Sequence, residues 1–217
     1  MNETCEIKAR VIYEKDLQSR YISHLDTIDI ICKALRRLQL PYLVTSGCHI
    51  RPKISFGAPL PLGHASRCEQ FILSLSETVT AEWLKNELSQ QLPAGMTVVS
   101  VELPAAEEKK GANGDLVEYR LGFSCEASAH KALAFLSNPE TSFSLVSKGK
   151  TKSFSIGEAV QKVELKQENS SYVISAEFIQ GQQSVPSVSK IVTALAEHLQ
   201  SARDDLFLIE RISLKKL

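Results

Sequence analysis

The sequence of 217 residues lacks the short motifs that usually hold a nucleotide, a cofactor or a catalytic nucleophile. It contains no glycine-rich phosphate loop with its lysine, no dinucleotide-binding fingerprint and no nucleophile elbow. A Cys-x-x-Cys pair and the three-cysteine motif of an iron–sulfur cluster are also absent. We therefore expect a chain with no catalytic residue, no metal and no cofactor of its own.

The sequence has no excess of either charge, since 25 basic and 25 acidic residues give a formal net charge of zero. A protein that coats a polyanion is usually more basic. Any nucleic-acid surface must therefore come from local clusters of cations. The overall composition, with 43% hydrophobic and 23% charged residues, is typical of a soluble globular protein.

Long hydrophobic runs are missing as well. No segment reaches transmembrane length, and the first residues, MNETCEIKARVIYEKD, lack the apolar core of a signal peptide. The five cysteines form an odd set without a repeating spacing, which argues against a disulfide framework. We expect a cytoplasmic chain with reduced thiols and no membrane partner.

The first half of the sequence predicts the order strand, helix, strand, strand, helix, strand. Ser23 is positioned to cap a helix that Pro41 ends, and Thr80 is positioned to cap a second one. The first helix should bury one face, made by Leu25, Ile28, Ile31, Cys32, Leu35 and Leu38. Strand patterns occupy residues 5–15, 69–77 and 96–103.

The second half repeats this order after a polar segment at 104–115. Strand patterns occupy residues 116–126, 142–150, 159–179 (as a hairpin) and 205–214. Between them, Ser128 should cap a helix ending before Pro139, and Pro186 should open another. The sequence thus predicts an α+β fold of two tandem ferredoxin-like (split βαβ) modules, 1–106 and 112–217.

Two basic segments follow the first helix of each half and are candidate phosphate-binding sites. Arg51 and Lys53 lie in a loop stiffened by prolines, and Arg36 and Arg37 end the helix before it. Lys148, Lys150 and Lys152 recur at period two, so an extended chain would direct them to one side. Equivalent positions in a repeat can face a shared groove. Protection of an edge strand by lysines is the alternative for the second segment.

Three residues at the start of the first helix, Ser23, His24 and Asp26, should shape that groove. A helix-entry hydrogen bond is the simpler role for His24, because a catalytic base would need a partner. Cys48, His49, His64 and Cys68 could together supply four zinc ligands, but their spacings differ from those of common structural zinc sites.

The stretch YISHLD, the ALRR at 34–37, the PLPLG at 59–63 and the later SKGKTKSFSI resemble the radical SAM-linked protein family. This is a domain of unknown function encoded beside, or fused to, cobalamin-binding radical SAM proteins. The chain departs from it at Cys48, His49 and Ile50, where the family usually has Phe-Asn-Pro. The resemblance implies a radical SAM protein as partner.

These patterns lead to the hypothesis of a non-catalytic module that recognises structured RNA (tRNA or rRNA) and assists a radical SAM enzyme. Seven cations would contact phosphate: Arg36, Arg37, Arg51, Lys53, Lys148, Lys150 and Lys152. One alternative is a metal-independent endoribonuclease resembling CRISPR repeat-processing proteins, with His24 or His49 as general base. Another is an adaptor that binds only the radical SAM protein.

Overall fold

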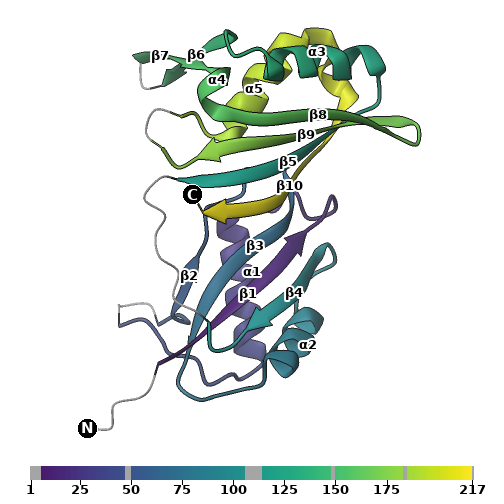
Figure 1. The fold of residues 1–217 in the computed structure, drawn as a ribbon. Helices are drawn as coiled ribbons and strands as arrows, with labels where there is room; N and C mark the ends of the chain where they lie inside the picture. The colour runs from purple at the N-terminus through teal and green to yellow at the C-terminus, as the bar shows by residue number, and fades with distance from the viewer. Residues whose placement is uncertain (1–5, 47–49, 106–113, 148–149, 183–184, 217) are drawn as a thin grey trace. The chain divides into compact units, whose positions relative to one another are not determined.

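The computed structural model describes residues 6–46, 50–105, 114–147, 150–182 and 185–216. The fold is mixed α+β, with five α-helices among the described residues (Figure 1). The chain divides into two compact units, Met1–Glu108 and Lys109–Leu217. The division falls within the polar segment that the sequence suggests as a linker. Residues 106–113 of this segment lie outside the described residues.

Unit 1 is built from four strands and two helices. In chain order they are β1 (Ile7–Lys15), α1 (His24–Arg37), β2 (Ile54–Phe56), β3 (Ala65–Leu75), α2 (Ala81–Gln91) and β4 (Met96–Glu102). The sheet order is β4-β1-β3-β2, and every pairing is antiparallel. Both helices contribute to one core with the strands, so one face of the sheet is covered.

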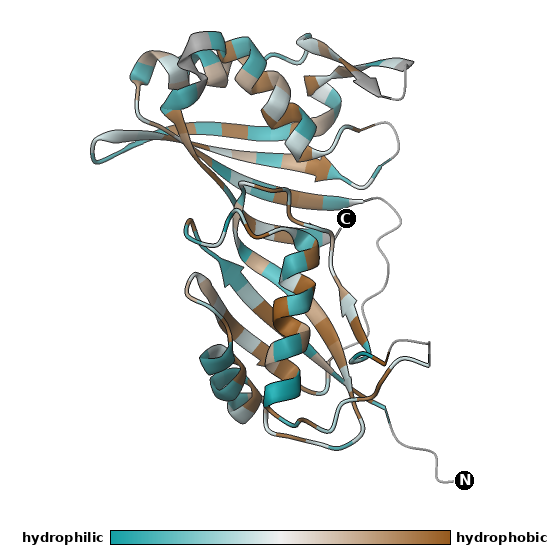
Figure 2. Cartoon of the chain, turned by 180° about the vertical axis from the view of Figure 1, so that it is seen from behind, coloured by the Kyte–Doolittle hydropathy of each residue, from teal (hydrophilic) through white to brown (hydrophobic). Residues whose placement is uncertain are grey.

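Helix α1 begins where the sequence predicts, but its buried face is rotated from the predicted one. Ile31, Cys32 and Leu35 are buried, whereas Leu25 is 75% exposed. The prediction for Leu25 was wrong because Thr27 and Ala34 lie on the covered side. Figure 2 shows hydrophilic and hydrophobic residues alternating along this helix. The helix therefore exposes a large apolar side chain at its first turn.

Unit 2 repeats the same plan with an insertion. Its main elements are β5 (Asp115–Phe123), α3 (Glu126–Ser137), β8 (Val160–Glu168), β9 (Ser171–Gln180), α5 (Val188–Leu199) and β10 (Leu206–Lys216). The sheet order is β10-β5-β9-β8, again antiparallel throughout. A 3₁₀ helix, Gln200–Asp205, links α5 to β10. The stripe predicted along α5, from Val188 to Leu199, is buried and joins the core.

Two helix starts in unit 2 differ from the predictions. Helix α3 has Cys125 as its N-cap, so Ser128 lies inside the first turn, where it is 3% exposed and its hydroxyl donates to Asp205. Helix α5 has Ser187 as its N-cap, one residue after the predicted Pro186. Polar residues can cap a helix or bond elsewhere within it, so sequence alone placed both starts only approximately.

The insertion in unit 2 lies between α3 and β8. It consists of β6 (Ser142–Ser147), β7 (Lys150–Ser155) and the short helix α4 (Ile156–Ala159). Strands β6 and β7 form their own antiparallel sheet, with Phe143 opposite Phe154 and Ser147 opposite Lys150. The single extended strand predicted for 142–150 was therefore wrong, because the chain reverses direction between Ser147 and Lys150. Phenylalanines that pair across the two strands favour this hairpin.

Candidate functional site

The start of α1 is fixed by a local hydrogen-bond network. The Ser23 hydroxyl accepts from the Asp26 backbone N–H at 3.1 Å and donates to the Asp26 carboxylate at 2.7 Å. The Thr27 hydroxyl donates to the Ser23 carbonyl at 2.8 Å. The predicted cap is confirmed, although the carboxylate bonds the Ser23 hydroxyl and not its backbone N–H. Ser23 and Asp26 therefore stabilise the N-terminus of α1, in addition to any role in binding.

His24 is the first residue of α1 and is half-buried. Its ring packs edge-on against Phe56 of β2, with the ring centroids 5.8 Å apart. Just before the helix, the Arg20 guanidinium lies 4.8 Å from the centroid of the Tyr21 ring. The described contacts of His24 are thus apolar, which is an arrangement that positions a ring and does not polarise it.

A buried lysine lies at the end of β1 and contacts the segment that leads into α1. Lys15 is only 2% exposed and its ammonium donates to the Ile22 carbonyl at 2.8 Å. Burial lowers the pKa of Lys15, and the nearby Glu69 carboxylate opposes part of that effect. Lys15 therefore holds the segment that leads into Ser23 and His24, and sequence reasoning missed it because a strand lysine is usually exposed.

Two of the predicted unit 1 cations, Arg36 and Arg51, are exposed. Burial raises the pKa of the Cys32 thiol, and the charges of Arg36 and Arg51 oppose part of that effect. One of these arginines lies on α1 and the other in the loop that follows it.

The other two unit 1 cations have partners within the unit. The Arg37 guanidinium donates to the side chain and the backbone carbonyl of Gln91, both at 2.7 Å. The Lys53 ammonium pairs with Glu6 at 2.9 Å. A hydrogen bond from Ser74, and then Lys53, lower the pKa of Glu6. These two cations are placed to stabilise the unit, so phosphate would have to compete with their partners.

Of the three predicted unit 2 lysines, the structure describes one side chain. Lys152 is exposed on β7, opposite Leu145 of β6. Lys148 lies outside the described residues, as does the side chain of Lys150, whose backbone opens β7. Lys150 and Lys152 lie two residues apart on β7, and the position of Lys148 stays a prediction.

A cation that sequence reasoning missed lies beside this hairpin. Lys190, in the first turn of α5, places its ammonium 5.6 Å from the centroid of the Phe154 ring. Phe154 in turn packs on Phe143, with centroids 5.8 Å apart. Lys190 and the hairpin are about 40 residues apart in sequence, so no local pattern could have linked them.

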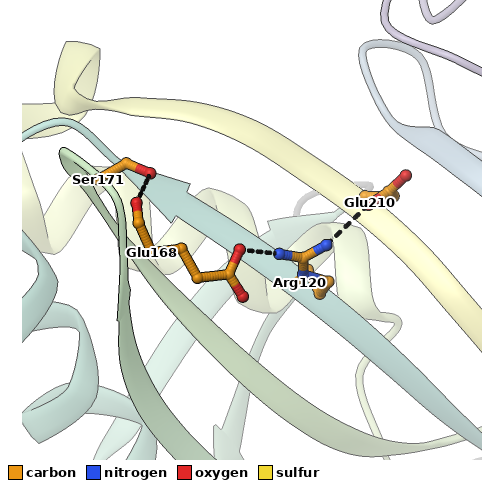
Figure 3. Close-up of polar contacts among 4 residues, drawn as sticks. All are labelled: Arg120, Glu168, Ser171 and Glu210. Atoms are coloured by element: carbon orange, nitrogen blue, oxygen red, sulfur yellow. Dashed lines mark hydrogen bonds and ion pairs between the residues drawn. The ribbon is translucent and has the colours of Figure 1, made fainter.

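The open face of the unit 2 sheet carries paired charges. Arg120 binds Glu168 at 2.5 Å and Glu210 at 4.0 Å, and Ser171 donates to the Glu168 carbonyl (Figure 3). Lys162 and Lys166 both pair with Glu164. By strand alternation the face also holds Glu118, Glu177 and Lys215, so five glutamates meet four cations. The charges of this face therefore nearly balance, and three of its cations already pair with glutamates.

The four candidate zinc ligands are not brought together among the described side chains. Cys48 and His49 lie outside the described residues, and His64 is only 5% exposed. Across the described part of the chain, no group of three or more potential ligands could hold a metal ion. In that same part, none of the helices has the length and apolarity needed to cross a bilayer.

These features define an α+β protein of two similarly built units, each with exposed cations in the segment that follows its first helix. The chain belongs to a family described as uncharacterized protein conserved in bacteria (DUF2344), whose model matches residues 8–189. No curated protein matches the chain.

Among solved structures, the chain is similar to one titled "Crystal Structure of an Unknown Protein from Galdieria sulphuraria". The two share 11% sequence identity over 98% of this chain and 99% of that one, with a TM-score of 0.27. A similarity of this size supports no argument about function or fold.

Proposed function

We propose that the chain is a non-catalytic module that binds structured RNA, tRNA or rRNA, through cations beside the first helix of each unit. The observation that carries the proposal is the division of the described cations into two sets. Arg37, Lys53 and Arg120 bind partners inside their own unit. Arg36, Arg51 and Lys152 are exposed, and among the described residues no ion pair engages them. Exposed cations without acidic partners are suited to contact phosphate.

The proposal extends to the fold, as two tandem ferredoxin-like modules. Its support is that both units share the order strand, helix, strand, strand, helix, strand once the β6–β7 hairpin and α4 are set aside. Both also share the antiparallel sheet order of fourth, first, third and second strand. In this plan the basic loop of unit 1 and the basic hairpin of unit 2 occupy the same place, between the first helix and the second strand.

The manner of binding follows from the charges. RNA-binding modules with a four-stranded sheet commonly stack bases on the open sheet face. In unit 2 that face carries five glutamates against four cations, three of which already pair with those glutamates, so it offers little free positive charge to RNA. We therefore assign the phosphate contacts of unit 2 to the β6–β7 hairpin and not to its four-stranded sheet.

The partner and the compartment belong to the same proposal. The SHLD, ALRR and PLPLG motifs resemble those of radical SAM-linked proteins, which suggests that the module delivers RNA to a cobalamin-binding radical SAM enzyme in the cytoplasm. Ser23, His24 and Asp26 would then border the RNA groove of unit 1. Asp26 is exposed and acidic, so its carboxylate would repel phosphate. These three residues would therefore affect the orientation of the RNA more than its affinity.

Binding of a tRNA mixture by the purified chain tests the proposal. Replacing Arg36 and Arg51 by Gln should weaken binding by roughly tenfold, because each arginine would lose the ion pair that it forms with an RNA phosphate. Lys162→Gln with Lys166→Gln is the matched control, because both lysines are exposed but paired with Glu164. The control should bind like the wild type. Absence of binding by the wild type, or equal losses in both variants, would refute the proposal.

The same preparation tests the endoribonuclease alternative. The described contacts of His24 are apolar, and the nearby Asp26 carboxylate accepts from Ser23, so we expect no RNA cleavage. Site-selective cleavage that disappears in His24→Ala would establish the nuclease instead. His49, the other candidate base, lies outside the described residues and is tested in the same way by His49→Ala.

A further inference from the structure

We propose that Lys190 of α5 and Lys152 of β7 form one phosphate-binding surface, with the Phe154 ring as its apolar floor. This inference rests on the proposed function and adds to it the binding surface of unit 2. Neither Lys190 nor Phe154 belongs to the basic segment that the sequence singles out. The surface is defined by three described residues only, from two elements that are distant in sequence.

The positions of Lys152 and Lys190 around Phe154 support this surface. Lys152 and Phe154 lie two residues apart on β7, so they share one face of the strand, at a spacing of about 7 Å. The Lys190 ammonium lies 5.6 Å from the centroid of the Phe154 ring. The two lysines therefore flank the same aromatic side chain. Two lysines that flank one ring can together contribute to the binding of one phosphate group or of two successive phosphates of a backbone.

The charges of Lys152 and Lys190 are not compensated by acidic side chains among the described residues. Like charges on neighbouring side chains destabilise a fold unless an opposite charge offsets them. On the sheet of the same unit, Lys162 pairs with Glu164 at 2.7 Å, and this contact raises the pKa of Lys162. In the described residues, no carboxylate pairs with Lys152 or Lys190. An anion from outside the chain would supply the missing compensation.

The Lys190 side chain is restricted in conformation before a ligand binds. A free lysine side chain loses conformational entropy when it binds, by up to about 2 kcal/mol. The contact of the Lys190 ammonium with Phe154 restricts that side chain in advance. Phe154 is itself held by Phe143, which packs on the core of the unit. The surface is thus partly ordered before a ligand arrives, unlike a lysine that is fully surrounded by water.

Binding of the same tRNA mixture tests the surface. Lys152→Gln and Lys190→Gln should each weaken binding about three- to fivefold, the size of an exposed ion pair. If both lysines bind one phosphate, the double variant should weaken binding by less than the product of the two single factors. Phe154→Leu keeps both charges but removes the ring, so it should reproduce part of the Lys190→Gln loss. Lys166→Gln, at an exposed lysine on β8 that pairs with Glu164, is the matched control and should bind normally.

The outcomes separate this inference from the proposed function. If Arg36 and Arg51 variants weaken tRNA binding but Lys152 and Lys190 variants do not, the surface is refuted and the proposed function stands. If the wild type binds no RNA, both fail. Competition by inorganic phosphate distinguishes the source of the anion. RNA that is displaced only by high salt supports the proposal, whereas specific displacement by millimolar inorganic phosphate would assign the surface to free phosphate and overturn it.

Discussion

Lys15 is the residue whose environment departs most from what its type suggests. Its ordinary pKa of 10.5 is lowered in the folded chain, mainly because the side chain is buried. As pH rises toward that ordinary value, the unfolded chain therefore holds this proton longer than the folded chain does. Stability then increases with pH through this group. Burial of the charged form is a cost that deprotonation removes.

Replacing Lys15 by Met should remove this pH dependence. We expect the free energy of unfolding of the wild type, relative to Lys15→Met, to increase as pH rises from neutral toward 10.5. Urea denaturation of both proteins at several alkaline pH values measures the difference. Other titrating groups are common to both chains and cancel. Parallel pH profiles would show that Lys15 keeps its ordinary pKa in the fold.

Single residues also show what the sequence could and could not predict. The Ser23 cap was predictable because a hydroxyl followed by a carboxylate three residues later is a local signal. The exposure of Leu25 was not, because helical spacing alone admits more than one buried face and tertiary packing selects it. For the same reason the burial of Lys15 has no signature in the sequence. The sequence predicts local features such as a helix cap, but it does not predict whether a particular side chain is buried.

At the scale of elements, Arg37 joins the two helices of unit 1. Its guanidinium bonds the last residue of α2 through both the side chain and the backbone carbonyl of Gln91. A cation at a helix C-terminus also interacts favourably with the helix dipole. Arg37→Ala should therefore reduce the free energy of unfolding by about 1 kcal/mol. Thermal or urea unfolding of the purified variants measures this loss.

Arg36→Ala is the matched control for Arg37→Ala. It is the neighbouring arginine on the same helix, exposed and without a described ion pair. It should change stability by less than about 0.5 kcal/mol. In RNA binding the order of effects should reverse, with Arg36 mattering more than Arg37. Equal effects of the two substitutions in both measurements would contradict the division of cations into structural and ligand-binding sets.

The hairpin of β6 and β7 is the element that sequence patterns described least well. Strand propensity was visible over 142–150, but the reversal between Ser147 and Lys150 was not. The turn becomes evident only when Phe143 is paired with Phe154, a contact across strands. The pairing also matters for the site, because Phe154 of this hairpin lies beside the ammonium of Lys190. The element order of each unit was predictable from periodicity; its insertion was not.

For the whole molecule, the domain bounds 1–106 and 112–217 remain a prediction. The chain divides into units Met1–Glu108 and Lys109–Leu217, each with its own hydrophobic core. Limited trypsin digestion should cut first at Lys109 or Lys110 and leave two fragments that resist further cleavage. Mass spectrometry of the first products identifies the site. A first cut within 70–100 would mean that unit 1 does not fold as a module.

The cation sets could only be sorted with the structure in hand. The sequence supplied Arg36, Arg51 and Lys152 as candidates, and among the described residues no ion pair engages their side chains. It supplied Arg37 and Lys53 equally, although both are engaged by Gln91 and Glu6. It did not supply Lys190. Sequence shows where charge is abundant, whereas availability of a charge depends on neighbours that the fold brings close.

The salt dependence of RNA binding tests the central claim most directly. Each phosphate contact that releases a counterion contributes close to one unit to the slope of log K against log salt concentration. Replacing Arg36, Arg51, Lys152 and Lys190 together by Gln should lower the slope for a tRNA mixture by about three to four units while leaving the fold intact. A slope equal to that of the wild type in the folded variant would contradict the claim that these cations bind RNA phosphate.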